Sequence, residues 1–490
     1  MSLKSLLLFS VAALAANPAV IDTDVAIIGG GASGAFAAVR TREDLGKKIV
    51  LIEKSDRLGG HTSTWHDPVT KAPFNYGLGV FMNMTAPREF FARFNISLKL
   101  PDRAEGRTVF ADFNTGKRTN YSEPTPEETA AAIARLGPEW YKYESMMLPT
   151  TQNFPSGDSI PNDLLLLWDD FARKYNVEPV TTTIWNNVGI VTDNALMIDM
   201  WKVFDPSVLR GVMVPVSEDN SEIFDKVSQL LGNDAMYKSQ VVSSRRTDNG
   251  VQLQVQGDGG MVTVNAKRLL ITIGTNLIDR EVYDLDDNED ALLHSVTGNR
   301  QWAGLVSHPS LEGFSITNSP AAAAPSNHLV HPRAPSLQAF EFLGNSSTGP
   351  VYRTIITTKM EHDMEDAKNV VQTALQNLMI AGTVPDGNVG QVDFKALHDH
   401  GMMYRHHSPE QLRADIVRRT NALQGKRSTW YTGASWSVHN AAMLWNATDI
   451  ILPKMLEGMY DYMISNVHAT PIFDEFMALN SSDCLNFWAE

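Results

Sequence analysis

The stretch DVAIIGGGASG, residues 24–34, decides the fold of this chain. Residues 25–28 form an apolar run typical of a buried parallel strand, and Gly29 permits the tight turn that follows it. Gly31 lacks the Cβ that would block the approach of phosphates, and Gly34 lets the next helix pack against the sheet. The stretch therefore predicts a strand, a glycine turn and a helix whose N-terminus binds a dinucleotide pyrophosphate.

A second apolar run, residues 49–52, ends at Glu53, which lies at the expected offset of about 20 residues beyond the glycines. Its carboxylate can accept hydrogen bonds from an adenosine ribose, which favours a ribose diol over a 2′-phosphate. We expect a helix over residues 32–45, ended by Gly46. The strand, the helix and the acidic residue all predict a dinucleotide site, but at this point the dinucleotide could be NAD or FAD.

The composition limits the classes of function. A chain of 490 residues is long enough for about two or three domains. Its net charge of −15, from 41 Lys and Arg against 56 Asp and Glu, would repel nucleic acid, so we expect no nucleic-acid partner. No stretch has the length of a stable membrane span. The oligomeric state is left open.

The first 16 residues have the pattern of a signal peptide: a short cationic start, a short apolar stretch and small residues near 13–15. Because Cys484 is the sole cysteine, no intramolecular disulfide can form. We expect the protein to be secreted or to reside in the lumen of the secretory pathway. Asn-X-Ser/Thr sequons, which are candidate glycosylation sites, support export and begin at Asn83, Asn95, Asn120, Asn345, Asn446 and Asn480.

Later segments return to the dinucleotide-binding domain, so the domains are expected to interleave. After the first part, residues 22–81, a helical insert covers 82–231, with helices over 126–136 and 163–175. Residues 232–275 form a β-meander with turns at 248–250 and 257–260, and end in an apolar strand at Gly274. A second insert covers 276–427. The last return, 428–490, includes a helix over 449–463.

Further glycine motifs follow the first one. Residues 57–62, RLGGHT, and residues 74–81, FNYGLGVF, predict repeated close approach of the backbone to one ligand, and Arg57 can pair with a phosphate. Residues 430–433, WYTG, lie at the start of the last segment that rejoins the dinucleotide-binding domain.

In the order and spacing of these motifs the chain resembles the flavin-dependent amine oxidase superfamily, most closely its fungal branch of β-cyclopiazonate dehydrogenase-like FAD oxidoreductases. The similarity covers nearly the whole mature chain. It implies an α/β fold, in which a Rossmann-type, glutathione-reductase-like FAD-binding domain is interleaved with an α+β substrate domain. It also implies FAD rather than NAD.

The resemblance assigns cofactor contacts by position. His61 stands where amine oxidases commonly have arginine, and two interpretations stay open: covalent attachment of FAD, or a hydrogen bond near it. Cys484 lies too far beyond the flavin motif to match a cysteinyl attachment. The implied contacts are Gly29, Gly31, Ala32, Ser33 and Gly34 at the pyrophosphate, Glu53 at the ribose, Arg57, Gly59 and Gly60 at the phosphate and ribityl, Val241 at the adenine, Gly433 at the flavin end, and His61, Tyr76, Gly77 and Gly274 along the cofactor.

Catalytic candidates are fewer. Residues 398–407, HDHGMMYRHH, precede the Gly433 return, and His400 or Tyr404 could act as acid or base. The alternatives are polar residues in a solvated loop, or a metal site at the His-X-His pair. Trp430 and Tyr431 could form an aromatic wall over the substrate or pack in the core. The lysine common in amine oxidases has no clear counterpart.

The expected function is that of an FAD-dependent oxidoreductase of fungal secondary metabolism. It would oxidise a small apolar or aromatic metabolite by C–N or C–C dehydrogenation or by oxidative cyclisation. Two alternatives remain: a redox-neutral flavin-dependent isomerase of double bonds in a polyunsaturated lipid, and a non-catalytic flavoprotein.

Overall fold

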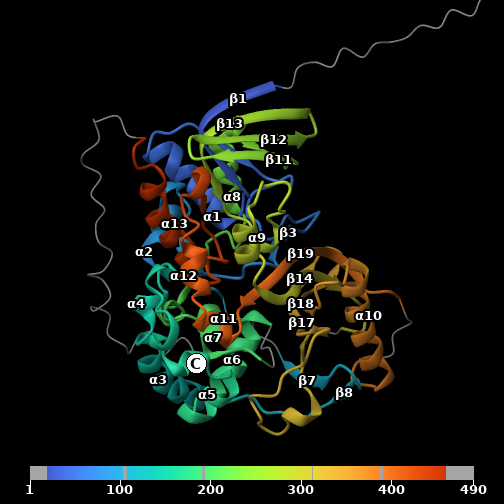
Figure 1. The fold of residues 1–490 in the computed structure, drawn as a ribbon. Coiled ribbons are helices and arrows are strands. Elements are labelled where there is room, and N and C mark those ends of the chain that lie inside the picture. The colour runs from blue at the N-terminus through green and yellow to red at the C-terminus, as the bar shows by residue number, and fades with distance from the viewer. Residues whose placement is uncertain (1–18, 103–106, 190–193, 312, 386–389, 460–490) are drawn as a thin grey trace, which may run out of the picture.

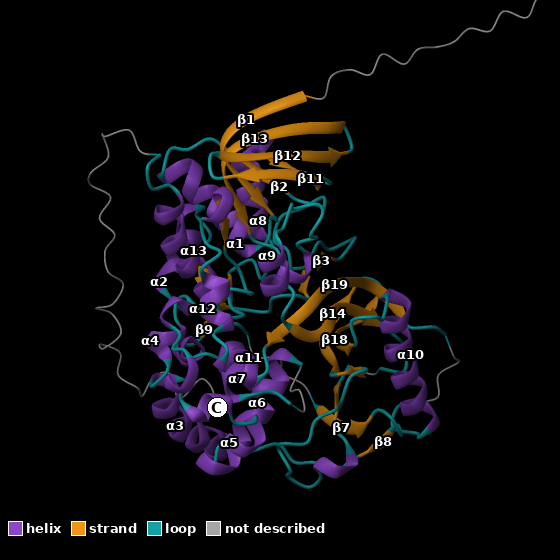
Figure 2. Cartoon of the chain, in the orientation of Figure 1, coloured by secondary structure: helices purple, strands orange, loops and turns teal. Residues whose placement is uncertain are grey.

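A computed structural model describes residues 19–102, 107–189, 194–311, 313–385 and 390–459 (Figure 1). The predicted signal peptide, Cys484 and the sequon at Asn480 lie outside these residues. Two large sheets and a group of helices make up the fold (Figure 2). None of the helices in the described ranges is both long and apolar enough to cross a membrane.

The first sheet has the order β10-β2-β1-β13-β12-β11, with β20 paired to β13. Its centre is parallel: Ile28 of β1 lies opposite Ile52 of β2 and Ile271 of β13. Residues 25–28 of β1 and all of β2 are buried on both faces, as in sheets covered by helices on two sides, whereas the first two residues of β1 are exposed. Its strands are β1 (Ala19–Ile28), β2 (Ile49–Ile52), β10 (Ala235–Met236), β11 (Gln240–Thr247), β12 (Gly250–Gly257), β13 (Gly260–Ile271) and β20 (Thr429–Tyr431).

Helices at this sheet come from distant parts of the chain. The predicted helix after the glycine turn is α-helical to Val39 and continues as a π-helical turn over Arg40–Asp44. The C-terminal helix begins at Ala441, eight residues before the expected 449, because the Asn440 side chain accepts a hydrogen bond from the Met443 N–H and caps it. These helices are α1 (Ala32–Val39), α2 (Thr85–Arg93), α8 (Glu222–Leu231), α9 (Asp287–Leu293) and α13 (Ala441–Met455).

The second sheet has the order β19-β14-β18-β17-β15-β7-β8, with β16 paired to β18. The helix α10 (Met364–Ile380) packs beside it (Figure 1). Two strands, β7 and β8, lie within the predicted helical insert, so that segment is not purely helical. The strands are β7 (Thr108–Asp112), β8 (Lys117–Arg118), β14 (Thr297–Ser307), β15 (Ser315–Asn318), β16 (Ser336–Leu337), β17 (Ala339–Ser346), β18 (Gly349–Thr358) and β19 (Asp393–His406).

Most remaining helices form a group below the first sheet in the view of Figure 1. The expected helix over 126–136 is α3, which runs on to Tyr141 and is capped reciprocally by Thr125 and Glu128. The expected helix over 163–175 is shorter, because a 3₁₀ turn covers its start. The helices are α3 (Pro126–Tyr141), α4 (Glu144–Met147), α5 (Trp168–Tyr175), α6 (Glu178–Val188), α7 (Met197–Val203), α11 (Pro409–Arg413) and α12 (Ile416–Asn421).

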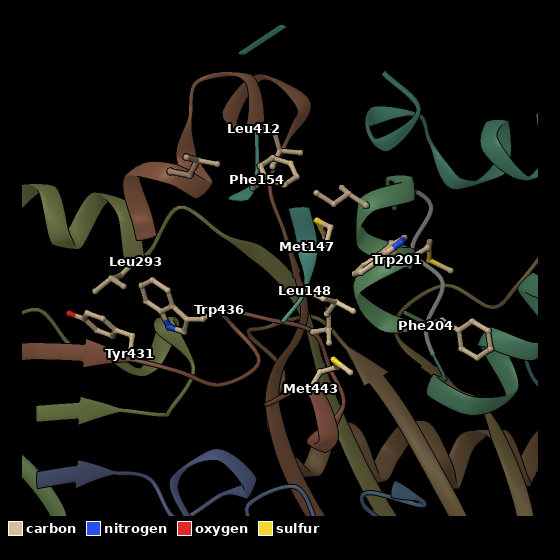
Figure 3. Close-up of a cluster of buried hydrophobic side chains, with 14 of the residues drawn as sticks. Met147, Leu148, Phe154, Trp201, Phe204, Leu293, Leu412, Tyr431, Trp436 and Met443 are labelled. Atoms are coloured by element: carbon tan, nitrogen blue, oxygen red, sulfur yellow. The ribbon is translucent and has the colours of Figure 1, made fainter. Parts of the chain in front are cut away.

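Short strands join these units: β3 (Thr64–His66) pairs with β4 (Pro73–Asn75), and β9 (Val212–Pro215) pairs with β5 (Phe81–Met82) and β6 (Leu98–Lys99). One hydrophobic core then continues from the first sheet into the helical group. Figure 3 shows part of it, with Tyr431 and Trp436 on one side and Trp201 and Phe204 on the other. Because the first sheet takes strands from three separate stretches of chain, the units interleave; the exact boundaries stay predictions.

Candidate functional site

The glycine turn after β1 has the geometry that the sequence predicts. Gly29 has a φ of +95°, and a Cβ at Gly34 would overlap the Gly29 carbonyl oxygen. A Cβ at Gly31 would meet only the Gly60 Cα, at 3.8 Å, so this side of the turn is open. No side chain caps the start of α1 at Gly31. Free N–H groups on an open side form a site suited to a diphosphate.

The second glycine motif packs directly on the first. The Gly59 N–H donates to the Gly30 carbonyl at 2.9 Å, and Gly59 and Gly60 have φ of +110° and +54°. A Cβ at Gly60 would lie 2.9 Å from the Gly31 Cα, too close for any residue except glycine. The two motifs therefore form one backbone surface, as repeated approach to a single ligand requires.

Arg57 holds the loop that carries His61. Its Nη1 donates to the carbonyls of Leu58 at 3.1 Å and Thr62 at 2.8 Å, and its Nη2 donates to the Gly60 carbonyl at 3.3 Å and Ser63 Oγ at 2.9 Å. This bracing role was not expected from the sequence. The phosphate contact assigned to Arg57 stays a prediction.

The predicted Tyr76-Gly77 motif holds the same loop from the other side. The N–H groups of Tyr76 and Gly77 donate to the Ser63 carbonyl at 2.9 and 3.3 Å. A Cβ at Gly77 would overlap the His61 carbonyl oxygen. The motif therefore acts by fixing the backbone of His61; a direct contact with the cofactor stays a prediction.

Glu53 is buried and closes the turn. Its Oε2 accepts the Gly30 N–H at 2.6 Å, and its Oε1 accepts the Ser55 N–H at 2.7 Å. Each oxygen keeps a second lone pair for a ribose hydroxyl. The Ser239 N–H donates to the Glu53 carbonyl at 2.9 Å, which brings the start of β11, and with it buried Val241, beside the predicted adenosine site.

Gly433 and Gly274 lie at the same edge of the sheet. Gly433 has a φ of +107°, and a Cβ there would lie 3.0 Å from the Thr272 carbonyl oxygen and 3.8 Å from Ser33 Oγ, so Gly433 adjoins the first turn of α1. At Gly274 a Cβ would overlap Arg405 Nη2. The missing side chain of Gly274 therefore makes room for a guanidinium, and the cofactor contact assigned to this residue stays a prediction.

Residues 398–406 belong to β19, so the expectation of a loop is wrong. The pairing of β19 with β14 has three irregularities, and two of them lie within residues 398–406. Asp399 faces Trp302 and Gly401 faces Gln301, which leaves His400 as the extra residue of a bulge. A second shift includes Tyr404, whose φ is +52°. Bulges redirect side chains and recur beside active sites, so both catalytic candidates occupy such positions.

Histidines from the loop after Gly60 and from β19 meet at this bulge. The rings of His61 and His400 stack with centroids 4.3 Å apart and planes 10° apart, and His398 lies edge-on to His400 at 5.3 Å. His398 Nδ1 is 3.0 Å from Ser63 Oγ. Stacked rings do not converge on one point, and in the described ranges no three His, Cys, Asp or Glu side chains could hold a metal. The contacts of the His-X-His pair therefore give no support to the metal interpretation, which stays untested.

His61, His398, His400 and His439 form what we call the histidine cluster. Burial lowers the pKa of His61 to about 4, helped by the charges of His398 and Arg405. Burial likewise lowers the pKa of His439 to about 3 and that of His400 well below its ordinary value. These three imidazoles are therefore neutral at pH 7. His61 is nevertheless exposed to solvent, as expected for a residue that protein surrounds but a ligand can reach.

Tyr404 adjoins the histidine cluster, with its ring centroid 5.0 Å from that of His439. Burial raises the pKa of its phenol, so the hydroxyl stays protonated. That hydroxyl donates to the Val188 carbonyl at 3.3 Å. Tyr404 is therefore a poor base, and its single O–H is already used by the Val188 carbonyl.

Trp430 and Tyr431 do not form one wall, because neighbouring residues of a strand point to opposite faces. Tyr431 is fully buried and stacks on Trp436 at 4.8 Å (Figure 3). Trp430 packs against the other core cluster of the first sheet, on the far side of β20. The core-packing interpretation of the pair is correct.

The sequons differ in exposure. Asn446 is buried within α13, so a glycan there would require unfolding, and this candidate is wrong. Asn95, Asn120 and Asn345 are exposed, and the side chain of Asn83 accepts a hydrogen bond from Arg88 Nε at 2.7 Å. The exposed sequons stay predictions.

The sequence did not single out Arg405, His439 or Lys202. His439 follows the Gly433 return without a motif, and its N–H donates to the Lys202 carbonyl at 3.1 Å. Arg405 was read only as part of a polar run. The one signal available was its place next to Tyr404 in that run.

The site fits FAD. Its turns leave backbone N–H groups without a side-chain cap at the start of α1. Three polar atoms are also buried without a hydrogen-bond partner: Ser33 Oγ, His400 Nε2 and Arg405 Nε. Such groups are expected where a ligand completes the hydrogen bonds. A Rossmann-type sheet with such a cradle, joined to a second sheet that supplies polar side chains, defines a dinucleotide-dependent oxidoreductase. A family described as NAD(P)-binding Rossmann-like domain matches residues 27–94.

Relatives identify the particular family. The FAD-dependent oxidoreductase dbaF of Emericella nidulans is 32% identical over 92% of this chain and 97% of its own. The FAD-dependent oxidoreductase pigF of Monascus ruber is 31% identical over 90% and 93%. Beta-cyclopiazonate dehydrogenase of Aspergillus oryzae is 26% identical over 89% and 93%. The chain belongs to this family of fungal FAD-dependent oxidoreductases, and FAD is its cofactor.

Solved structures agree on the fold. A CLA-producing fatty acid isomerase from P. acnes superposes with a TM-score of 0.66 at 16% identity, over 88% of this chain and 98% of that one. Putrescine oxidase bound to putrescine superposes with a TM-score of 0.60 at 16% identity, over 89% and 99%. The amine oxidase-like fold expected from the resemblance is thereby confirmed.

Proposed function

We propose that this oxidoreductase acts on a small apolar or aromatic metabolite, by C–N or C–C dehydrogenation or by oxidative cyclisation. FAD supplies the hydride acceptor, so the protein needs to supply orientation, electrostatics and exclusion of water rather than a nucleophile. The sparse set of candidate acids and bases on β19 agrees with such chemistry.

The observation that carries the proposal is the neutral, flat lining of the histidine cluster. Since burial holds the pKa of His61 and of His400 low, both rings are uncharged at pH 7. The nearest carboxylate on β19, Asp399, pairs with Arg300 at 2.5 Å. A cationic amine would therefore meet Arg405 without a counter-ion, whereas an aromatic ring could stack on the imidazoles. This supports an apolar or aromatic substrate over a simple amine.

His400 and Tyr404 then take different roles. His400 is neutral and its Nε2 lacks a partner, so it is the better acceptor for a proton that leaves the substrate. Tyr404 keeps its proton, which it donates to the Val188 carbonyl, so its oxygen can orient a substrate N–H or O–H by accepting a hydrogen bond. A positioned acid or base accelerates reactions about 10²- to 10⁴-fold.

Anaerobic bleaching of the flavin by a panel of indole alkaloids, amines and fatty acids tests the proposal. We expect an aromatic or apolar compound to bleach the wild type, and His400→Gln to slow that bleaching about 100-fold while the flavin stays bound. His294→Gln, on α9 and paired with Asp290, is the matched control. Bleaching by simple amines alone would contradict the proposal. A shifted double bond without bleaching would indicate the isomerase, and no response at all a non-catalytic flavoprotein.

We also propose export into the secretory pathway, on the strength of the predicted signal peptide and the exposed sequons. Mass spectrometry of the purified native protein should find an N-terminus near residue 17, and a glycosidase should lower its mass. An intact Met1 without glycans would contradict this.

The two interpretations of His61 can be separated by acid denaturation. Flavin colour that stays with the precipitate, and moves to the supernatant in His61→Gln, would support covalent attachment. Colour in the supernatant of both proteins would support a hydrogen-bonding or stacking role.

A further inference from the structure

Arg405 is a half-buried cation, and no counter-ion lies beside it among the described residues. Its Nη2 donates to Asn276 Oδ1 at 2.8 Å, and this is the one hydrogen bond recorded for its guanidinium within the described ranges. Nε is buried and has no partner. Guanidinium carries five N–H donors, so most of its capacity is unused. Burial lowers the pKa of Arg405 to about 10, and no carboxylate opposes this effect. Such a group is costly unless a ligand completes it.

The guanidinium is held at the junction of the two sheets. Arg405 comes from β19, yet its Nη2 occupies the place above Gly274, at the end of β13. Its charge lowers the pKa of both His61 and His439, which places it beside the histidine cluster. The fold thus directs a planar donor group toward the side chains that we propose contact the substrate, rather than toward solvent.

The other charged and titratable groups near this end do not neutralise it. Lys202 is a second cation close to His439, and burial lowers its pKa, while its neighbour Asp199 raises it. Burial raises the pKa of Asp199, which Lys202 and His406 partly offset. Burial lowers the pKa of His407, and the charges of Lys202 and His406 lower it further. Lys202 and Asp199 thus act on each other, which leaves Arg405 without a carboxylate of its own among the described residues.

We propose that Arg405 recognises an acidic group of the substrate, a carboxylate or an acidic enol, so that the substrate class is an apolar or aromatic metabolite bearing an anion. This inference rests on the proposed function. Asn276 fixes one edge of the guanidinium, and the other N–H groups bind the two oxygens of the acid side by side, the geometry in which arginine binds carboxylates. The anion then holds the apolar part of the substrate against the histidine cluster.

Binding of benzoate to the FAD-loaded enzyme tests this inference, with uncharged benzamide as the matched ligand. Binding is followed by perturbation of the flavin absorption band and requires no turnover, so the result is independent of the bleaching panel. We expect benzoate to bind the wild type about 10- to 150-fold more tightly than benzamide, and Arg405→Met to remove that preference. Arg405→Lys should restore part of it. Arg353→Met, a paired arginine on β18, should keep it.

Gly274→Ala gives a second variant that keeps the charge. Its Cβ would overlap Arg405 Nη2, and Gly274 has an ordinary extended backbone, so alanine displaces the guanidinium without straining the chain. We expect the same loss of preference for benzoate, while Gly259→Ala, with nothing within 4 Å, should keep it.

Three results would overturn the inference. Benzoate could bind no more tightly than benzamide, including the case in which neither perturbs the flavin. The preference could survive in both Arg405→Met and Gly274→Ala. Finally, Arg405→Met could change the FAD affinity or the flavin midpoint potential as strongly as it changes the affinity for benzoate. That result would show that the guanidinium serves the cofactor instead. Failure of the bleaching panel alone, with the benzoate preference intact, would count against the proposed function only.

Discussion

Replacing Glu53 separates its two roles, support of the glycine turn and binding of the ribose. In the structure Oε2 and Oε1 each accept one backbone N–H, from Gly30 at 2.6 Å and from Ser55 at 2.7 Å. A hydrogen bond to a charged group contributes about 1.5–3 kcal/mol. Because solvent can reach part of the emptied space, we expect Glu53→Ala to lower the free energy of unfolding of the apoprotein by about 3 kcal/mol.

The ribose contact adds a separate loss in FAD affinity. One further charge-assisted hydrogen bond of about 1.5–3 kcal/mol corresponds to about 10- to 150-fold weaker FAD binding. Glu53→Gln keeps the shape and one acceptor oxygen, so it should lose less of both quantities than alanine. Urea unfolding of the apoprotein measures the first quantity, and fluorescence titration of the apoprotein with FAD measures the second.

Asp67→Asn provides the matched control. Asp67 also accepts backbone N–H groups, from Val69 and Thr70 at 2.8 Å, and it joins its loop to Ser347 away from the glycine turn. This variant should lower stability and leave the FAD affinity of the folded protein unchanged. Wild-type FAD occupancy in purified Glu53→Ala would refute the assigned ribose contact, and unchanged apoprotein stability would refute the bracing role.

Three further predictions follow from single contacts. Gly34→Ala should abolish FAD occupancy or soluble expression, because its Cβ overlaps the Gly29 carbonyl oxygen; normal yellow protein would contradict this packing. Burial lowers the pKa of His439 and His407 to about 3. Their contribution to the free energy of unfolding is therefore complete above pH 6.5. It is lost at lower pH, because the unfolded chain takes up protons that the folded chain does not. Urea unfolding at pH 5 should therefore show a loss of up to about 2 kcal/mol per histidine relative to pH 7, and His439→Phe should reduce it. Asn446→Gln should leave the glycoprotein mass unchanged on gels, and a mass shift would contradict its burial.

The parts of the fold that could be predicted are those in which one residue type is required locally. Gly29 must have a positive φ, Gly34 must lack a Cβ, and Glu53 must follow β2, so each requirement leaves a mark in the sequence. The hairpins of the β-meander were readable for the same reason. These constraints act over a few residues and do not depend on how the rest of the chain packs.

The catalytic strand could not be read this way. A strand with one buried face shows alternation, but β19 has three irregularities in its pairing with β14, and two of them break the alternation around His400 and Tyr404. Its polar residues and Gly401 then resemble a loop. The role of the aromatic pair at 430–431 could not be decided from the sequence for a related reason. Aromatic residues fit both a wall over the substrate and the hydrophobic core, and only their place on a strand distinguishes the two.

Arg405 shows why residue type alone does not define a site. Its position depends on the pairing of β19 with β14, on the approach of β19 to the end of β13, and on the absence of a side chain at Gly274. Each of these is a long-range consequence of packing. None leaves a local pattern, so an arginine in a polar run gives no indication that its Nε is buried and that its guanidinium has no counter-ion among the described residues.

The same geometry couples the cofactor to the substrate side chains. Arg57 donates hydrogen bonds to the loop that carries His61, and Gly77 packs against the backbone of His61. Gly59 and Gly60 of the same loop pack on the glycine turn after β1. The ring of His61 in turn stacks on His400 of the second sheet. Backbone hydrogen bonds and a ring stack therefore connect the glycine turn to the bulge on β19 through this one loop, and we expect FAD binding at the turn to fix the position of the His400 ring. The two sheets then act as one site, although their strands come from separate, interleaved stretches of the chain.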